Sequence, residues 1–346
     1  MNFNKILTFW YSNNKRDLPW RETQNPYHIW LSEIILQQTQ VKQGLPYYEA
    51  FVKQYPTVFD LANATEEAVL KLWQGLGYYS RARNLHTASK HIAFNLKGEF
   101  PDNYKDLLKL KGVGDYTASA IASIAYNEPA AVVDGNVYRV LSRYFGIETP
   151  INSTNGIKEF KKLAVSLINK DEPAIYNQAI MEFGALQCKP KNPDCDTCPL
   201  SDSCIALQKN MVDQLPVKLK KTKVTTKYFN FLVCLDNDKN VLFEKRTNKG
   251  IWQNLYQFPL IESKKSLAAE EFHLLDLKSV QLKSSVVDYS LYNDMDKVHK
   301  LSHQHLHTKF WILEMANLPD NAIPIKDITK YPTPVLISEF IEAFKF

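Results

Sequence analysis

The sequence predicts a protein of two domains, an all-helical domain over residues 1–210 and an α+β domain over residues 227–346. Apolar residues recur every three or four positions in the first part, which is typical of amphipathic helices. Short runs rich in aromatic and β-branched residues fill the second part, which is typical of strands. With 346 residues, 45% of them hydrophobic, the chain has enough apolar material for two cores. A disordered or collagen-like protein is excluded.

The individual elements follow from these patterns and from the turn residues between them. Helices are expected over residues 28–43, 65–72, 82–95, 104–110, 117–126, 137–145 and 157–168. A basic, glycine-free stretch containing Lys218, Lys220, Lys221 and Lys223 indicates a linker over residues 211–226. Strands are expected over residues 228–235, 241–246, 286–291 and 309–313, with a hairpin turn at 236–240 and a closing helix at 335–346.

The charge distribution differs between the two parts. Residues 1–225 hold 27 Lys and Arg against 22 Asp and Glu, whereas the remainder holds 15 against 15. This excess permits binding to nucleic acid, although a mildly basic solvated surface would have the same composition. The chain lacks the run of about 18 apolar residues that a membrane-spanning helix needs, and its start is too polar for a signal peptide. We expect a cytoplasmic, monomeric protein without membrane contact.

Four cysteines form the strongest motif. Cys188, Cys195, Cys198 and Cys204 follow the spacing C-x6-C-x2-C-x5-C, and the remaining Cys234 stands alone in the second domain. Four thiolates this close in sequence can surround zinc or a [4Fe-4S] cluster. A disulfide pair is disfavoured because cytosolic thiols stay reduced. Zinc sites usually contain two pairs with C-x2-C-like spacing, so the single pair here favours the cluster.

A glycine turn separates two helical patterns. Gly112, Val113 and Gly114 would let the backbone approach a partner closely and direct N–H groups at an anion, next to the positive end of the following helix. This geometry suits a DNA phosphate. A tight turn between two helices is the alternative, and the nearby Lys105, Lys109 and Lys111 favour phosphate.

Two carboxyl groups stand in unlike environments. Glu33 shares a helix face with Ile29, Trp30 and Leu36, so burial would raise its pKa and let it act as a general acid; a solvent-exposed Glu is the alternative. Asp134 stands where it would cap the next helix, and accepted N–H bonds would favour its ionised form. A simple structural cap is the alternative for Asp134. Together, one raised and one depressed carboxyl suit cleavage of a glycosidic bond.

Six motifs, taken in order, resemble the MutY-type adenine DNA glycosylases of the helix-hairpin-helix superfamily related to endonuclease III. The resemblance spans nearly all of residues 1–210. The motifs are Leu-Pro-Trp-Arg at 18–21, Glu-Ile-Ile-Leu-Gln-Gln-Thr-Gln-Val at 33–41, Gly-Leu-Gly-Tyr-Tyr-Ser-Arg at 75–81, the hairpin at 112–114, Val-Asp-Gly-Asn-Val-Tyr-Arg at 133–139 and the cysteine array.

The resemblance implies a function and a set of roles. The enzyme would bind double-stranded DNA, flip out adenine paired with 8-oxoguanine or guanine, and excise it in base-excision repair. Glu33 would protonate the departing adenine at N7, and Asp134 would stabilise the oxocarbenium ion or trap it covalently. Asn136 and Tyr116 would support catalysis. The adenine pocket would be lined by Trp20, Arg21 and Leu36, and Gln178 and Glu182 would also reach it. Gln38 and Tyr78 would wedge into the base stack.

One position separates two activities. Endonuclease III-type enzymes carry a lysine two residues after the second hairpin glycine, where it forms a Schiff base and cuts the strand. Here that residue is Tyr116, so we expect a monofunctional glycosylase. The alternatives are a bifunctional endonuclease III-like lyase and a non-catalytic iron–sulfur DNA-binding protein. A zinc base deaminase is disfavoured because no histidine begins the H-x-E motif.

The second domain resembles, more faintly, the Nudix-like module of the same family. Residues 250–259 are similar to its tryptophan-rich segment ending in Phe-Pro, but the metal-binding Nudix box does not follow, so we expect no nucleotide hydrolysis. Leu301, Ser302 and His303 resemble the family's Phe-Ser-His loop with leucine in place of phenylalanine. Ser302 and His303 would then read 8-oxoguanine. A metal site among His299, His303, His305 and His307 is disfavoured, because we expect no nearby carboxylate or cysteine to complete it.

Overall fold

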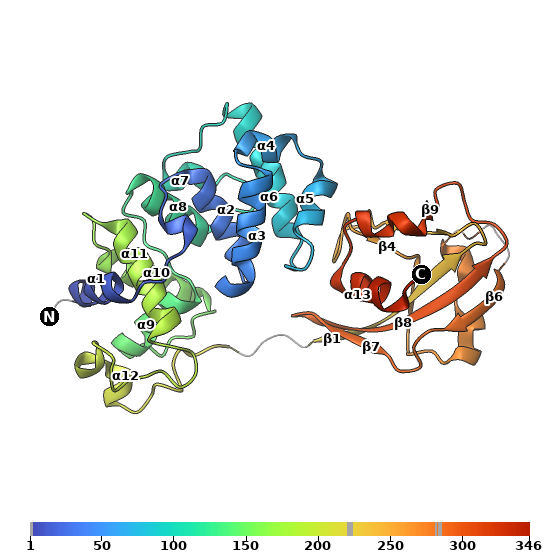
Figure 1. The fold of residues 1–346 in the computed structure, drawn as a ribbon. Coiled ribbons are helices and arrows are strands. Elements are labelled where there is room, and N and C mark those ends of the chain that lie inside the picture. The colour runs from blue at the N-terminus through green and yellow to red at the C-terminus, as the bar shows by residue number, and fades with distance from the viewer. Residues whose placement is uncertain (1–2, 220–223, 281, 283–285) are drawn as a thin grey trace. The chain divides into compact units, whose positions relative to one another are not determined.

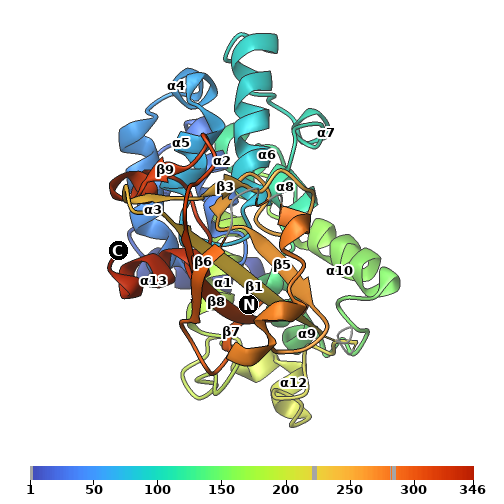
Figure 2. The same ribbon diagram turned by 90° about the vertical axis from the view of Figure 1, so that its right-hand side faces the viewer.

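The computed structural model describes residues 3–219, 224–280, 282 and 286–346, and the chain divides into two compact units (Figure 1). The first unit comprises Met1–Asn63 and Asn84–Lys220, and the second comprises Ala64–Arg83 and Lys221–Phe346. Among the described residues, helices build the first unit and the strands lie in the second (Figures 1 and 2), which confirms the predicted fold class. The boundaries of the predicted linker stay a prediction, because Lys220, Lys221 and Lys223 lie outside the described residues.

The first unit is a succession of helices joined by short turns. They are α1 (Phe3–Asn14), η1 (Pro19–Arg21), α2 (Pro26–Leu36), α3 (Val41–Gln54), α4 (Val58–Asn63), α6 (Ser80–Lys90, which begins in the second unit), η2 (His91–Asn95), α7 (Tyr104–Leu107), α8 (Asp115–Tyr126), α9 (Gly135–Phe145), α10 (Thr154–Leu167), α11 (Pro173–Leu186), η3 (Ser201–Ser203) and α12 (Ile205–Gln208).

Local signals explain where these helices begin and end. Asn25 caps α2 by accepting a hydrogen bond from the Tyr27 N–H at 2.9 Å. The prediction of one helix over 28–43 is wrong, because Gln38 adopts a left-handed φ of 56° and separates α2 from α3. The helix predicted over 104–110 is shorter, since α7 ends at Leu107. Helices at 65–72, 82–95, 117–126, 137–145 and 157–168 are confirmed with small shifts at their ends.

The core of the first unit forms where α11 packs against α1, α8 and α9. Phe160, Tyr176 and Phe183 are fully buried there, and Trp10 meets Phe183 edge to face at 5.0 Å. Helix α2 packs against α8 as well. This packing holds the ends of four helices at fixed positions around the pocket described below, namely α2, α8, α9 and α11.

The second unit is built on a parallel pair of long strands. β1 (Thr225–Leu235) runs parallel to β8 (Gln304–Met315), and the sheet order is β6 (Val286–Leu291), β8, β1, β2 (Asn240–Val241) and β9 (Ile323–Pro324). β5 (Leu260–Ser263) pairs with β1 and β7 (Lys297–Lys300) with β8, while β3 (Glu244–Lys245) and β4 (Tyr256–Gln257) form a separate ladder. The other elements are α5 (Glu66–Leu72), η4 (Ala269–Leu274), η5 (Leu277–Val280), η6 (Ile325–Lys330) and α13 (Val335–Phe344).

Two strand predictions need correction. The strand expected over 241–246 is split into β2 and β3, which belong to different sheets, because Val241, Leu242 and Phe243 are buried in succession and break the alternation of faces. The strand expected over 309–313 is the end of the much longer β8, whose first half is rich in histidine. The strands at 228–235 and 286–291 and the closing helix are confirmed.

Residues 64–83 dock on the C-terminal part of the chain through polar contacts. Asn254 Nδ2 donates to Glu66 Oε1 at 2.6 Å, and Lys71 Nζ donates to the Thr329 carbonyl at 2.7 Å. These contacts explain why the segment belongs to the second unit. Among the described residues, no helix combines the length and apolar character needed to cross a membrane.

Candidate active site

A pocket of about 180 Å³ lies in the first unit between η1, α2, α8, α11 and the N-terminal end of α9. Most of the predicted catalytic and pocket residues meet there although they are far apart in sequence. Those lining it are Trp20, Arg21, Glu33, Leu36, Tyr116, Asp134, Asn136, Gln178 and Glu182. Gln38 is not in the lining; it is exposed in the turn after α2.

Glu33 is buried on α2, with 8% of its surface exposed. Burial raises its pKa to about 7, while the Tyr116 hydroxyl and Arg21 oppose the rise and Asp134 adds to it. The predicted direction is confirmed, and the alternative of a solvent-exposed carboxyl is wrong. At neutral pH a large fraction of Glu33 is protonated and can donate its proton.

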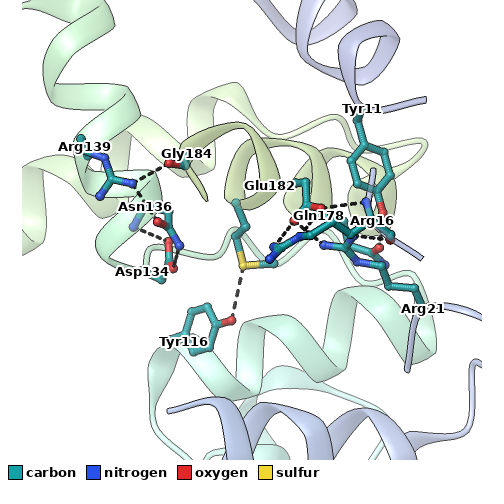
Figure 3. Close-up of polar contacts among 11 residues, drawn as sticks. Tyr11, Arg16, Arg21, Tyr116, Asp134, Asn136, Arg139, Gln178, Glu182 and Gly184 are labelled. Carbon is teal, nitrogen blue, oxygen red and sulfur yellow. Dashed lines mark hydrogen bonds and ion pairs between the residues drawn. The ribbon is translucent and has the colours of Figure 1, made fainter. Parts of the chain in front are cut away.

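Tyr116 stands in the first turn of α8, with its ring directed into the pocket (Figure 3). Its hydroxyl donates a hydrogen bond to Met181 Sδ at 3.3 Å, and the same hydroxyl interacts with Glu33. Burial raises the pKa of Tyr116, so the phenol keeps its proton at physiological pH. Sequence reasoning missed Met181, because a methionine on a largely apolar helix carries no signal of its own.

Asp134 caps α9, as the sequence predicts. Its Oδ1 accepts hydrogen bonds from the N–H groups of Asn136 at 2.9 Å and Val137 at 2.8 Å, and its Oδ2 accepts one from Asn136 Nδ2 at 2.8 Å. The expected depression of its pKa is wrong. Burial raises the pKa of Asp134, and the three hydrogen bonds and Arg139 only oppose that rise. The loss of water around the carboxyl outweighs its donors.

Arg139 connects this cap to the cysteine loop through hydrogen bonds to Asn136 and to the Cys188 carbonyl. Its guanidinium donates to Asn136 Oδ1 at 2.8 Å, to the Gly184 carbonyl at 2.6 Å and to the Cys188 carbonyl at 2.7 Å. Asn136 is therefore held from both sides, by Asp134 and by Arg139. One turn further along α9, Arg143 donates to the Lys189 carbonyl at 2.7 Å and contacts Cys188 Sγ at 3.5 Å.

Glu182 on α11 binds two arginines at the wall of the pocket across from Asp134 (Figure 3). Its buried carboxylate pairs with Arg16 at 2.6 Å and with Arg21 at 2.8 Å. Burial opposes ionisation, but the hydrogen bonds from the two guanidinium groups prevail and lower the pKa of Glu182 to about 2. Gln178 also lines the pocket and accepts a hydrogen bond from the Tyr11 hydroxyl at 2.5 Å. Arg16 was missed because only the fold brings it to Glu182.

The hairpin before α8 has the backbone that its glycines suggest. Gly112 adopts a φ of 80°, and a Cβ there would lie 2.7 Å from Asn84 Cβ, so a larger residue would clash. Gly114 occupies the N-cap position of α8 and has open space around it. The Val113 side chain is buried, so only its backbone can face a ligand. Lys109 pairs with Asp106 at 2.6 Å.

The four clustered cysteines line one small cavity together with Arg143. All four are free thiols with partial exposure. Among the described residues, no three His, Cys, Asp or Glu side chains approach closely enough to hold a single ion. Four soft sulfur donors that line one cavity suit a soft metal centre, which can be zinc or an iron–sulfur cluster. Cys234 is buried in β1 of the second unit.

A second pocket, of about 550 Å³, lies within the second unit. Tyr78, Leu301, Ser302 and His303 line it, so the structure brings the predicted wedge residue next to the predicted recognition loop. Ser302 and His303 are exposed in the turn between β7 and β8, with Ser302 Oγ 3.3 Å from His303 Nδ1. Tyr78 is 48% exposed and has a left-handed φ of 46°.

Two further residues of the second pocket were missed. Trp252 is buried with a left-handed φ of 60°, a rare conformation for an aromatic residue, and its ring packs against His299 at 5.8 Å. The pair supports the wall next to Ser302. Trp252 lies in the predicted tryptophan-rich segment but was assigned no role, and the preceding Gly250 was a local signal of an unusual turn.

Comparisons with known protein families agree with both units. Residues 31–164 match the model described as "HhH-GPD superfamily base excision DNA repair protein". Residues 188–204 match the iron-sulfur binding domain of endonuclease III, and residues 230–343 match the NUDIX domain. The cysteine loop therefore binds an iron–sulfur cluster, as its spacing predicts.

Individual relatives and solved structures are similar to this chain as well. An adenine DNA glycosylase of Buchnera aphidicola subsp. Acyrthosiphon pisum is 33% identical, covering 88% of this chain and 84% of that protein. One of Homo sapiens is 42% identical, covering 62% of this chain and 41% of that protein. The structure of a thermostable thymine-DNA glycosylase matches 60% of this chain and 95% of its own with a TM-score of 0.56 and 31% identity. A non-covalent endonuclease III–DNA complex matches 60% and 94% with a TM-score of 0.53 and 25% identity.

Proposed function

This chain belongs to the adenine DNA glycosylases, and we propose that it removes adenine paired with 8-oxoguanine or guanine and leaves an abasic site without cutting the strand. Membership of the family makes it a base-excision repair enzyme that hydrolyses an N-glycosidic bond in DNA. The partner base, the monofunctional outcome and the roles of individual residues are the proposed part. The observation that carries them is the meeting of Glu33 and Asp134 in one pocket.

Glu33 is the proposed general acid. Its pKa of about 7 keeps part of the population protonated at neutral pH, so the group can protonate adenine as the base departs. Protonation makes adenine a better leaving group, because the electron pair of the glycosidic bond then neutralises a positive charge on the base. The mostly apolar neighbours of Glu33 on α2 keep competing water away from that proton.

Asp134 is the proposed stabiliser of the sugar cation. The departing base leaves an oxocarbenium-like sugar, and a carboxylate beside it lowers the energy of that state. Burial raises the pKa of Asp134, but three N–H donors bind its oxygens and favour the carboxylate. The approaching positive charge favours the same form, so the ionised Asp134 is stabilised when it is needed.

The walls of the pocket are proposed to bind the flipped adenine. Trp20 and Leu36 offer apolar surface, and Arg21 offers a guanidinium whose orientation is fixed by Glu182. Because Glu182 is paired with two arginines, we assign it to positioning Arg21 rather than to direct contact with the base. Gln178 has its amide oxygen occupied by Tyr11, which leaves its amide N–H groups for the base.

The monofunctional outcome rests on Tyr116. Strand cleavage by this superfamily's lyases needs an amine in the pocket to form a Schiff base, and a phenol cannot form one. Among the described residues that line the pocket, none is a lysine. Lys161 is engaged by Asp115 at 2.9 Å, and Lys109 by Asp106 at 2.6 Å. A water molecule is therefore the proposed nucleophile.

The [4Fe-4S] cluster is held by Cys188, Cys195, Cys198 and Cys204 and has a structural role here, because a bound cluster fixes the loop between its ligands. Lys189 and Lys191 are exposed on that loop and are proposed to contact DNA phosphates. The backbone of the hairpin at Gly112–Gly114 is proposed to contact another phosphate.

The second pocket is proposed to receive the base opposite adenine. Ser302 and His303 are exposed hydrogen-bonding groups in a turn between two strands, and Tyr78 lies in the same pocket as an aromatic surface on which a base can stack. Leucine at position 301 offers no ring for stacking, so recognition of 8-oxoguanine depends on polar contacts of its two neighbours.

The test is single-turnover cleavage of a duplex that carries 8-oxoguanine opposite adenine, analysed with and without alkali. We expect strand breaks only after alkali, since an abasic site breaks under alkali and an intact strand does not. Breaks without alkali, together with borohydride trapping of the protein on DNA, would establish a lyase instead. No breaks in either condition, from protein that binds DNA and retains its cluster, would refute the proposed substrate.

A further inference from the structure

Met181 occupies an unusual position for an apolar side chain. It projects from α11 into the pocket of the first unit, where its sulfur accepts the hydrogen bond of Tyr116 at 3.3 Å. Thioether sulfur is a weak acceptor, so a phenol usually prefers an oxygen. The Glu33 carboxyl offers an oxygen to the same hydroxyl, and a hydrogen bond from Tyr116 to that oxygen lowers the pKa of Glu33.

A phenol has one proton and can donate it to one partner at a time. If Tyr116 donates to Glu33, the carboxylate form of Glu33 is favoured. If Tyr116 donates to Met181, the phenol oxygen of Tyr116 can only accept a hydrogen bond from Glu33. Only the protonated form of Glu33 can donate that bond. The direction of this hydrogen bond therefore decides which form of Glu33 the site favours.

We propose that Met181 is a positioning residue whose sulfur takes the phenol proton of Tyr116, so that Glu33 retains the proton it delivers to the departing base. This inference rests on the proposed function of the pocket. In the step itself, the O–H bond of Glu33 breaks and an N–H bond forms on adenine. The electron pair of the glycosidic bond leaves with the base, and Tyr116 keeps its proton throughout.

Other charged groups around Glu33 act on it from several elements. Asp134 disfavours its ionisation through charge, and Arg21 favours it. Glu182 and Arg16 also line the pocket and are paired with each other. Met181→Leu changes none of these charges. A shift in the pH dependence after that substitution therefore reports the direction of the Tyr116 hydrogen bond.

The experiment compares single-turnover adenine release by wild type, Met181→Leu, Tyr116→Phe and the double variant between about pH 5 and about pH 9 on a duplex with 8-oxoguanine opposite adenine. Leucine has nearly the same volume but cannot accept a hydrogen bond. We expect Met181→Leu to move the alkaline limb of the rate profile to lower pH by about one unit, which is about a tenfold loss of rate above that limb and little loss near pH 5. In the Tyr116→Phe background, the same substitution should shift nothing.

Two further variants sharpen the result. Met181→Gln restores an acceptor of similar length and should return the limb toward its wild-type position. Met295→Leu makes the same replacement at a side chain that is 87% exposed in the second unit, and should leave the profile unchanged. The absorbance of the cluster and the thermal midpoint confirm that each variant is folded.

The outcomes separate the two ideas. An unshifted limb in Met181→Leu, or an equal loss of rate at every pH in both backgrounds, would overturn the positioning role while leaving the proposed function intact. Wild-type protein that binds the duplex but releases no adenine would refute the proposed function, and the positioning role with it.

Discussion

A methyl group added at Gly184 should disturb catalysis without touching the substrate. Gly184 lies on α11 against the first turn of α9, and a Cβ there would lie 2.7 Å from Asn136 Cβ and 3.0 Å from the Asn136 carbonyl oxygen. Ordinary contacts between carbon atoms are about 3.5–4.0 Å. Gly184→Ala therefore forces the two helices apart by roughly 1 Å at the residue that holds Asp134. The contact is with backbone and Cβ atoms, which cannot rotate away.

The expected loss of rate follows from this displacement of the two helices. Misplacing a catalytic group by about 1 Å costs on the order of a hundredfold in rate, and overpacking costs about 1–3 kcal/mol of folding free energy. We expect single-turnover adenine release by Gly184→Ala to fall by roughly that factor, with the cluster absorbance retained. The affinity for DNA should change little, because the clash at Gly184 is with Asn136 and does not involve the hairpin at Gly112–Gly114 or the exposed Lys189 and Lys191.

A matched control lies one residue from Asp134. A Cβ at Gly135 meets nothing within 4 Å, so Gly135→Ala adds the same methyl to the same end of α9 without a clash. Its rate should stay close to that of the wild type. The reasoning would be refuted by a Gly184→Ala protein with wild-type rate and thermal midpoint, or by equal losses in the two variants.

Three other perturbations follow from the site. Since the pKa of Glu33 is about 7 and its protonated form is the acid, the single-turnover rate should fall as pH rises through that value. Glu33→Gln should lower the rate about 10²–10⁴-fold and remove this fall at alkaline pH. A fall that persists in Glu33→Gln would assign the pH dependence to another group. The pKa of Glu182 is lowered to about 2 in the fold, so its pairing contributes stability above the unfolded value near 4.5 that is lost as pH falls between the two. Thermal unfolding should show about 3 kcal/mol of this acid-dependent stability in the wild type, whereas Glu182→Gln should lose that dependence and be less stable at neutral pH. Ser302→Ala should reduce the preference for 8-oxoguanine over guanine opposite adenine by about tenfold, the value of one hydrogen bond, and an unchanged ratio of the two rates would remove Ser302 from recognition.

Properties that depend on near neighbours in sequence were predictable. Asp134 caps α9 because the N–H groups it accepts belong to residues two and three positions along. Glu33 has a raised pKa because the helical repeat surrounds it with apolar side chains. The cysteine spacing predicts the cluster because all four ligands lie on one short loop.

Properties that depend on what packs over a residue were not predictable. The three donors of Asp134 were visible in the sequence, but the burial that outweighs them comes from other elements of the fold. The break at Gln38 ended a helical pattern that reads as continuous. The residues after Asn240 read as one strand, yet they pass from one sheet to another.

The family, the cluster and the two carboxyl groups can be read from the sequence alone, because each depends on residues at short, fixed spacing. Their surroundings depend on the packing of the fold. It brings Arg16 to Glu182 across 166 positions, Met181 to Tyr116 across 65, and β1 beside β8 as a parallel pair. Contacts this distant in sequence depend on how helices and strands pack, and that packing sets the electrostatics of the site.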